Sequence, residues 1–216
     1  MELTYLFLIP AFFIYWCVNE KVGIQLGMVV LLSIWANSII KELNIQLPIH
    51  IEFGWIIIAV VFCGYIFLRK TIETLLSMGG LRAYIITSAV VSFIMILYCP
   101  SFEFVLPGGS FLGLSVGYCL NKRYVGFKTS DVLQRKGLIK FLTLFARFLL
   151  GIAVLAAIMF RVESIIERIA ERQNIKLYIF LCYALISLWV SFVAPWIFIK
   201  LRLAGISNSD TTEQKQ

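Results

Sequence analysis

The sequence has few charged residues for its length. Of its 216 residues, 14% are charged and 61% are hydrophobic, and the mean hydropathy is +0.92. A soluble domain contains about 25% charged and about 45–50% apolar residues. A soluble fold of this length could not bury so many apolar side chains. The shortage of charge therefore excludes a soluble protein and indicates helices that contact lipid.

The sequence also lacks the usual signatures of cofactor and metal sites. It contains no P-loop, no dinucleotide-binding fingerprint and no cluster of metal ligands. The cysteines are odd in number and form no CxxC pair, which argues against a disulfide framework. They are Cys17, Cys63, Cys99, Cys119 and Cys182. We therefore expect neither a cofactor nor a bound metal.

The first apolar run lacks the features of a secretory signal peptide. Glu2 is its only charged residue, so the basic amino-terminal region of a signal peptide is missing. No small-residue cleavage site precedes Asn19. We predict that this run remains as a helix of the mature protein.

Apolar runs of membrane-spanning length fill most of the chain. A spanning helix needs roughly 20 apolar residues, with about 17 as the lower limit. The candidate spans are 3–18, 22–40, 53–68, 83–98, 104–120, 139–160 and 177–199. We predict an all-α integral membrane protein with a bundle of about six to seven transmembrane helices. Residues 1–206 form one membrane domain, and residues 207–216 form a disordered tail.

Basic residues are concentrated on one side of the predicted bundle. With side A defined as the side of the amino terminus, side B holds Lys21, Arg69, Lys70, Arg82, Lys122, Arg123, Lys128, Arg135, Lys136, Lys140, Lys200, Arg202 and Lys215. Side A holds Lys41, Arg161, Arg168, Arg172 and Lys176. Cytoplasmic loops carry an excess of lysine and arginine. Side B and the carboxyl terminus are therefore predicted to be cytoplasmic, and the net charge of +7 reflects membrane orientation rather than nucleic-acid binding.

Three features inside or beside the spans admit structural or functional interpretations. Gly109, Gly113 and Gly117 repeat every four residues, which makes a flat stripe for close helix packing. Arg147 lies inside the 139–160 run. It is either a functional charge within the membrane or a side chain that reaches the cytoplasmic surface. The segment 161–176 is either an amphipathic extension at the outer interface or a turn with a solvated face.

Three motifs occur together in a recognisable order. The first is IYWCVNEKVG at residues 14–23, followed by Ser33, Asn37 and Lys41. The second is GGSFLGLSVGY at 108–118, and NKRYVGF follows at 121–127. This set resembles the bacterial type 2 phosphatidic acid phosphatase (PAP2) family over roughly residues 10–155.

The resemblance implies a six-helix core with a histidine-based active site at the outer membrane surface. Enzymes of this family remove phosphate from lipids. One histidine attacks phosphorus, a second acts on the leaving oxygen, and an aspartate orients the attacking histidine. Lysine and arginine side chains hold the phosphate oxygens, which is consistent with the need to stabilise developing negative charge.

Most of the residues that this chemistry requires are absent. Where the family has Arg-Pro after the motif lysine, this chain has Leu47-Pro48, and Pro-Ser-Gly-His does not occur. Aligned on the Gly108-Gly109 pair, the positions of the third motif hold Ile94, Met95, Ser101 and Val105. His50 is the only histidine in the chain, whereas the reaction needs two. We therefore predict a degenerate member of the family.

The remaining candidate residues follow from this comparison. His50 and Ser101 are the candidates for any surviving catalysis, and Lys41, His50 and Glu103 are the candidates for binding a lipid phosphate. Lys41 can equally be a lysine that snorkels at a helix end, and Glu103 a solvated charge.

The predicted function is a non-catalytic one in the cell membrane. The protein binds the headgroup of a phospholipid or polyprenyl phosphate, or acts as a subunit of a membrane complex, with itself or with another protein through the glycine stripe. The alternatives are a small lipid transporter and an atypical lipid phosphate phosphatase.

Overall fold

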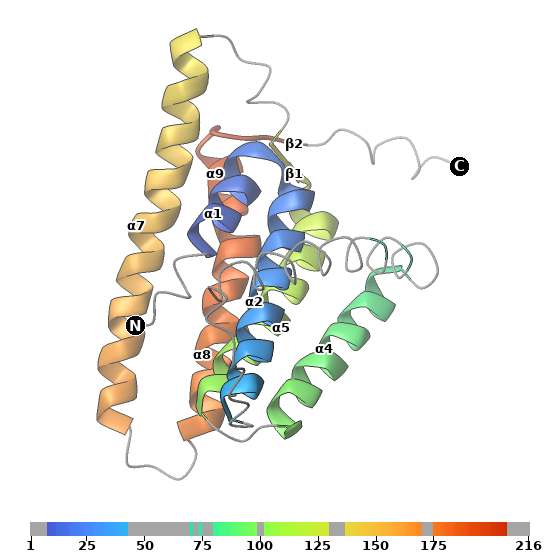
Figure 1. Cartoon of the computed structure of the whole chain (residues 1–216). Helices are drawn as coiled ribbons and strands as arrows, with labels where there is room; N and C mark the ends of the chain where they lie inside the picture. Colours follow the sequence, from blue (N-terminus) through green and yellow to red (C-terminus); the bar gives the residue numbers. More distant parts are fainter. Residues whose placement is uncertain are drawn as a thin grey trace, which may run out of the picture.

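The structure, a computed structural model, describes residues 8–42, 70, 74, 80–98, 102–129, 137–169 and 175–206. Within these ranges the chain is a bundle of long helices that run between two ends, which confirms the predicted all-α class (Figure 1). The predicted span 53–68 and the predicted tail 207–216 lie outside the described residues.

The amino-terminal part of the described chain is a helical hairpin. Helix α1 (Leu8–Phe13) continues as the π-helical turn η2 (Ile14–Val18), and after Asn19 the chain reverses into α2 (Glu20–Glu42). The side chain of Asn19 caps α2, because its Oδ1 accepts hydrogen bonds from the backbone N–H groups of Lys21 and Val22 at 3.0 and 3.2 Å. A Cβ at Gly23 would overlap the backbone of Tyr15, so glycine is required for this close approach.

The described part of the first predicted span is short. The continuous helix from Leu8 to Val18 is about 16 Å long at 1.5 Å per residue, whereas the hydrocarbon core of a bilayer is about 30 Å thick. By contrast, α2 has 23 residues, which corresponds to about 35 Å.

The middle of the chain contributes two neighbouring helices. Helix α4 (Gly80–Tyr98) is antiparallel to α5 (Phe102–Leu120), and the two are in contact. Helix α5 continues as the π-helical turn η3 (Asn121–Val125) and ends at Gly126. Gly126 has φ +61°, the left-handed conformation that commonly ends a helix. The short strand β1 (Phe127–Lys128) follows.

The carboxyl-terminal part is a second helical hairpin. Helix α7 (Gly137–Ile169) is followed by α8 (Ile175–Leu188), the π-helical turn η4 (Trp189–Val193) and α9 (Ala194–Lys200). Strand β2 (Gly205–Ile206) then pairs antiparallel with β1. The predicted extension at 161–176 is a direct continuation of α7 as far as Ile169, so no turn begins at Arg161.

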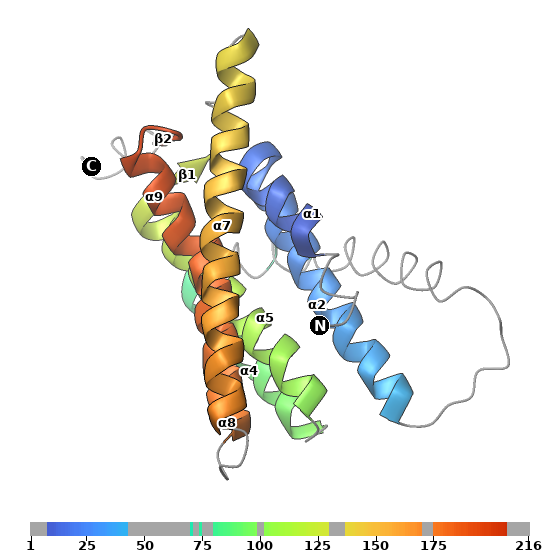
Figure 2. The ribbon, with the colours of Figure 1, turned by 90° about the vertical axis from the view of Figure 1, so that its left-hand side faces the viewer.

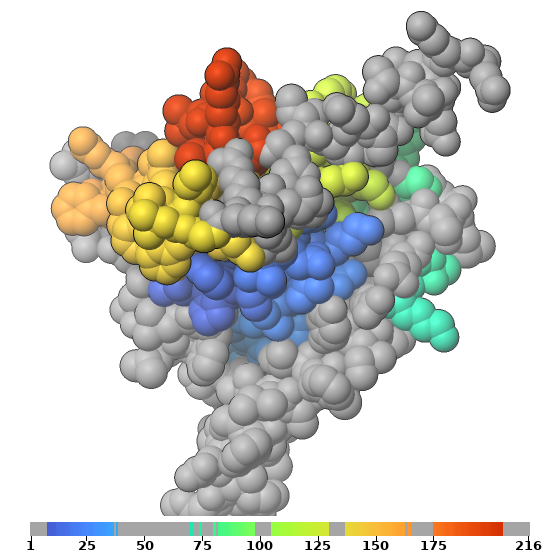
Figure 3. Space-filling view, turned by 90° about the horizontal axis from the view of Figure 1, so that it is seen from above, coloured from blue at the N-terminus to red at the C-terminus, as the bar shows by residue number. Residues whose placement is uncertain are grey.

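The helix directions gather the predicted side-B residues at one end. The start of α2, the end of α5, the start of α7 and the end of α9 all lie at the upper end in Figure 1. Figure 3 looks onto this end and shows the first residues of α7 (yellow) beside the blue amino-terminal hairpin and the red carboxyl-terminal segment. We call this the side-B end and the opposite one the side-A end.

Helix α5 lies at the centre of the bundle and packs most closely against α8. A Cβ at Gly109, Gly113 or Gly117 would overlap atoms of Phe180, Ala184 or Ser191 respectively. The glycine stripe is thus filled by a helix of the same chain. This corrects the alternative in which the stripe binds a partner protein, because its surface is not free.

The outer surfaces of the bundle are apolar. Among the described residues, two helices, Gly137–Val162 and Ile175–Lys200, are long and apolar enough to cross a membrane, and Leu8–Val18 and Arg82–Leu97 are shorter apolar helices. Figure 2 looks at the bundle from the side of α7, which covers one edge of it. Large apolar side chains are exposed along α7: Leu138, Ile139, Phe141, Leu142, Phe145, Leu149 and Phe160. Such a surface is suited to lipid rather than water.

Candidate functional site

The side-B end contains a buried hydrogen-bonded cluster formed by the three π-helical turns. Tyr15 of η2 donates its hydroxyl to the carbonyl of Ser191 in η4 at 2.7 Å. Asn121 of η3 donates its Nδ2 to the Tyr15 hydroxyl at 2.7 Å and to the same carbonyl at 3.2 Å. The Oδ1 of Asn121 accepts the N–H of Phe127 at 3.3 Å. The cluster thus joins segments far apart in the chain.

Three further contacts surround this cluster. The indole of Trp16 donates its Nε1–H to the carbonyl of Val190 at 3.0 Å and packs edge to face against Phe198, with ring centroids 5.9 Å apart. The hydroxyl of Thr129 donates to Oε2 of Glu20 at 2.8 Å. These contacts connect the amino-terminal hairpin to the segment after α5 and to η4 and α9.

Arg147 is a structural residue at this same end of the bundle. Its side chain is fully buried. Its Nε donates to the carbonyl of Leu203 at 2.9 Å, its Nη1 donates to the carbonyl of Trp16 at 3.1 Å, and its guanidinium lies 5.4 Å from the ring centre of Phe127. The charge therefore binds carbonyls near the ends of two helical segments, where the helix dipole favours a cation. It does not snorkel to the surface, and its contacts are within the protein.

The residues that carry the family resemblance thus have structural roles at the side-B end. Tyr15, Trp16 and Asn121 hold the π-helical turns together, Asn19 caps a helix, and Gly126 ends one. The described contacts of these residues are with other parts of the chain.

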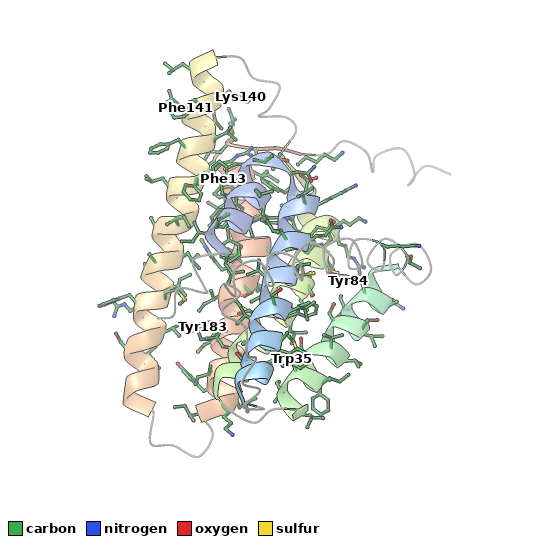
Figure 4. The ribbon with its side chains drawn as sticks, in the orientation of Figure 1. Phe13, Trp35, Tyr84, Lys140, Phe141 and Tyr183 are labelled. Carbon is green, nitrogen blue, oxygen red and sulfur yellow. The ribbon has the colours of Figure 1, made fainter. Side chains whose placement is uncertain are left out.

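Four positions correspond to the family's third motif, and the three that are described lie toward the side-A end and hold apolar side chains; the fourth, Ser101, lies outside the described residues. Met95, which stands where the family has arginine, is 1% exposed. Its carbonyl accepts the Nε1–H of Trp35 at 3.3 Å, and Figure 4 shows Trp35 on the face of α2 that is directed toward α4. Val105, which stands where the family has aspartate, is also buried, and Ile94 is exposed on the outside of α4. None of these side chains can bind phosphate or transfer a proton.

A groove of about 450 Å³ lies beside these positions, between α4, α5 and α8. Its lining is almost entirely apolar: Ala89, Ser92, Phe93, Ile96, Val105, Leu112, Lys176, Leu177 and Phe180. Volumes of roughly 300–1,000 Å³ are typical of small-molecule sites. The groove is thus large enough for part of a lipid, and its walls favour hydrocarbon over phosphate.

The other predicted site residues lie at or beyond the edges of the described segments. His50 and Ser101 are outside the described residues. Lys41 is in the last turn of α2 and Glu103 in the first turn of α5, so both backbone positions are at the side-A end. Their side chains are outside the described part, so their proposed roles in phosphate binding remain predictions.

Sequence reasoning did not single out Ser92 or connect Lys176 with a site. Ser92 is a lone hydroxyl in the apolar run of α4, and Lys176 begins the last predicted span. A polar residue within a span is the signal that could have drawn attention to Ser92. Among the described residues, no group of three or more His, Cys, Asp or Glu side chains lies together to bind a metal.

Comparison with known proteins gave one match. Residues 105–206, from the groove residue Val105 to the end of β2, match the family described as PAP2 superfamily phosphatase, transmembrane extension. No curated protein and no solved structure matched the chain. The match covers most of α5 and the carboxyl-terminal hairpin, including the glycine stripe, Asn121 and Arg147. The match supports membership of the PAP2 superfamily, in agreement with the resemblance of the amino-terminal motif.

Proposed function

We propose that this protein binds a phosphate-bearing lipid at the side-A end without hydrolysing it. The observation that carries the proposal is the replacement of the family's arginine and aspartate by Met95 and Val105, both buried in apolar packing. The chain also has one histidine in total, whereas the family's reaction uses two. Attack on phosphorus needs an activated nucleophile and cationic groups that stabilise the transferring oxygens. Neither can be provided by these two side chains.

Lipid binding is supported by the surroundings of the same positions. The apolar groove reaches Val105, and the side-A end also contains the backbone positions of Lys41 and Glu103. A lysine at a helix end can bind a lipid phosphate as a point charge. The excess of exposed basic residues at the side-B end, such as Lys122, Arg123 and Lys128, supports a cytoplasmic side B and a binding site on the outer face of the cell membrane.

The test is phosphate release by the purified full chain in detergent. Phosphatidic acid, phosphatidylglycerophosphate and undecaprenyl diphosphate are the substrates, with His50→Ala beside the unsubstituted protein. We expect no release above a protein-free blank. Release that His50→Ala abolishes would contradict the proposal and indicate a rearranged active site.

A binding measurement completes the test. We expect the unsubstituted chain to bind phosphatidic acid, and Lys41→Ala to weaken that binding. Lys21→Ala, at the opposite end of α2, is the matched control and should bind as the unsubstituted chain does. Equal binding by all three proteins would contradict the role of Lys41.

The transporter alternative has less support from the described residues. A solute path needs polar groups that are free to contact the solute. The hydroxyls of Ser33, Ser38, Ser88 and Ser115 instead donate to backbone carbonyls four residues earlier in their own helices. The hydroxyl protons of these serines are therefore engaged in hydrogen bonds within their own helices.

A further inference from the structure

The groove between α4, α5 and α8 opens on the outside of the bundle. Phe93 of α4 is 60% exposed and Leu177 of α8 is 61% exposed, and the exposed Ala89 also lines the groove. These residues form its rim, whereas Val105 of α5 forms its floor. In a membrane, this rim faces lipid, so a hydrocarbon chain can enter sideways from the bilayer without crossing water.

One polar side chain in the groove has an unused hydrogen-bonding group. Ser92 is 1% exposed, and its hydroxyl has no hydrogen-bond partner in the described part of the protein. Most buried polar groups are paired, because an unpaired one costs free energy. Ser88, one turn earlier, donates to its own helix at 2.8 Å. Because the oxygen itself is buried, the hydroxyl can donate to a ligand only when the side chain rotates toward the groove that Ser92 lines.

A cationic group stands at the side-A edge of the same groove. Lys176 is exposed and is the second residue of α8. The first turn of a helix presents unpaired N–H groups and the positive end of the helix dipole, which both favour an anion beside Lys176. Ser92 lies six residues before the end of α4, which places it about 9 Å deeper along the helix axis.

We propose that this groove binds one acyl chain of an anionic glycerophospholipid from the side-A leaflet. Lys176 binds the phosphate, the hydroxyl of Ser92 donates to the ester carbonyl, and the chain lies against Val105 and Leu112. An ester carbonyl accepts hydrogen bonds and lies deeper than the phosphate, as Ser92 lies deeper than Lys176. A polyprenyl phosphate has no such carbonyl, so the hydroxyl favours the glycerophospholipid. This inference rests on the proposed lipid-binding function and specifies where in the bundle the lipid binds.

The experiment is native mass spectrometry of the full chain titrated with three lipids. The lipids are dioleoyl phosphatidic acid, its dialkyl ether analogue, which lacks the ester carbonyls, and undecaprenyl phosphate. We expect the ester lipid to bind about two- to tenfold more tightly than the ether, which is the usual range for one hydrogen bond. Ser92→Ala should remove that difference. Undecaprenyl phosphate should bind more weakly than the ester lipid.

Substitutions at the rim test the location. Ala89→Trp places a large ring in the groove, and we expect it to weaken binding of the ester lipid at least about tenfold. Val90→Trp is the matched control, because Val90 is 51% exposed on the same helix but does not line the groove. It should bind normally. Lys176→Gln should weaken binding of phosphatidic acid but not of uncharged dioleoylglycerol. Thermal unfolding of each variant verifies that it is folded.

The outcomes separate this inference from the proposed function. Lipid binding that is unchanged in folded Ala89→Trp, or an ester preference that persists in Ser92→Ala, would overturn the inference and leave the proposed function intact. The inference would also be overturned if undecaprenyl phosphate bound more tightly than the ester lipid and its affinity were unchanged in Ser92→Ala. Phosphate release, or no binding of any of these lipids, would instead refute the proposed function.

Discussion

At the side-B end of the bundle, buried side chains from η2, η3 and α7 donate hydrogen bonds to backbone carbonyls. At the side-A end, the described side chains form an apolar groove that contains an unpaired hydroxyl. The two ends therefore contribute differently to the molecule. The side-B end holds the helices together through polar contacts, whereas the side-A end contains an open apolar groove.

The comparison also explains why the resemblance to the family is strong in one region and fails in another. Tyr15, Trp16 and Asn121 are needed wherever these helices must meet, since they pair polar groups that would otherwise be unsatisfied away from water. The side chains of Met95 and Val105, by contrast, are buried and contribute apolar packing. On the proposed function, the fold is retained without the family's chemistry.

The largest effect is expected from placing the family's arginine back at the side-A end. Met95→Arg would bury a charge in apolar packing without a described partner, and we expect a loss of at least about 4 kcal/mol in the free energy of unfolding. The chain should then fail to purify as a single species in gel filtration. Met95→Leu, which keeps the volume, should purify normally. A stable Met95→Arg protein would show that a polar site survives there.

Removing the central cation of the side-B end should have the next largest effect. Arg147→Met leaves the carbonyls of Trp16 and Leu203 without their described donors, at an expected cost of about 3 kcal/mol. The melting temperature should fall by about 10 °C. Labelling of the buried thiols of Cys17 and Cys119 by a thiol-reactive dye reports unfolding. Arg161→Met, on the exposed surface of the same helix, should melt normally; equal melting of both variants would refute the role of Arg147.

The glycine stripe connects the two ends, and its substitution should cost somewhat less. Gly113→Ala forces α5 away from the backbone of Ala184, and overpacking of this kind costs about 2 kcal/mol. Gly108→Ala is the control on the same helix, because its new Cβ would meet its nearest neighbours at 3.5–3.6 Å, an ordinary contact distance. The same dye measurement should separate the two variants, and a neutral Gly113→Ala would contradict the close contact.

The smallest effect is expected at a single hydroxyl of the side-B cluster. Tyr15→Phe removes the donor to the carbonyl of Ser191 and the acceptor of Asn121, while Asn121 can still donate to that carbonyl. We expect a loss of about 1 kcal/mol, measured by the same thermal unfolding. The exposed Tyr124→Phe should have no effect. If the two variants lose the same stability, the cluster is not what holds this end together.

The sequence predicted the helices better than the contacts between them. The predicted spans 83–98, 104–120 and 177–199 agree to within three residues at each end with α4, with α5 and with the continuous helical segment from α8 to α9. The agreement is close because the ends of a long apolar run mark the ends of the helix. The close packing at Gly113 follows from its spacing with Gly109 and Gly117. The partners of Arg147 could not be predicted, since the residues whose carbonyls it binds lie 56 and 131 positions away.

The candidate site was predicted in part. Alignment to the family motif directed attention to Met95 and Val105. No local pattern marks the groove beside them, because its walls come from three separate helices. The unpaired state of the Ser92 hydroxyl depends on its rotamer and its neighbours, which a sequence does not specify. His50 and Ser101 lie outside the described residues, so their roles stay predictions.

The hydrogen bonds of Tyr15 and Trp16 can form only late in the synthesis of the chain. Both side chains enter the membrane early in synthesis, but their partners are the carbonyls of Ser191 and Val190, which lie 176 and 174 residues later. Until α8 and α9 are inserted, these polar groups must rely on other partners inside the membrane. A nascent chain that stops before η4 therefore cannot complete its side-B end, which offers quality-control machinery a means of distinguishing unfinished chains from complete ones.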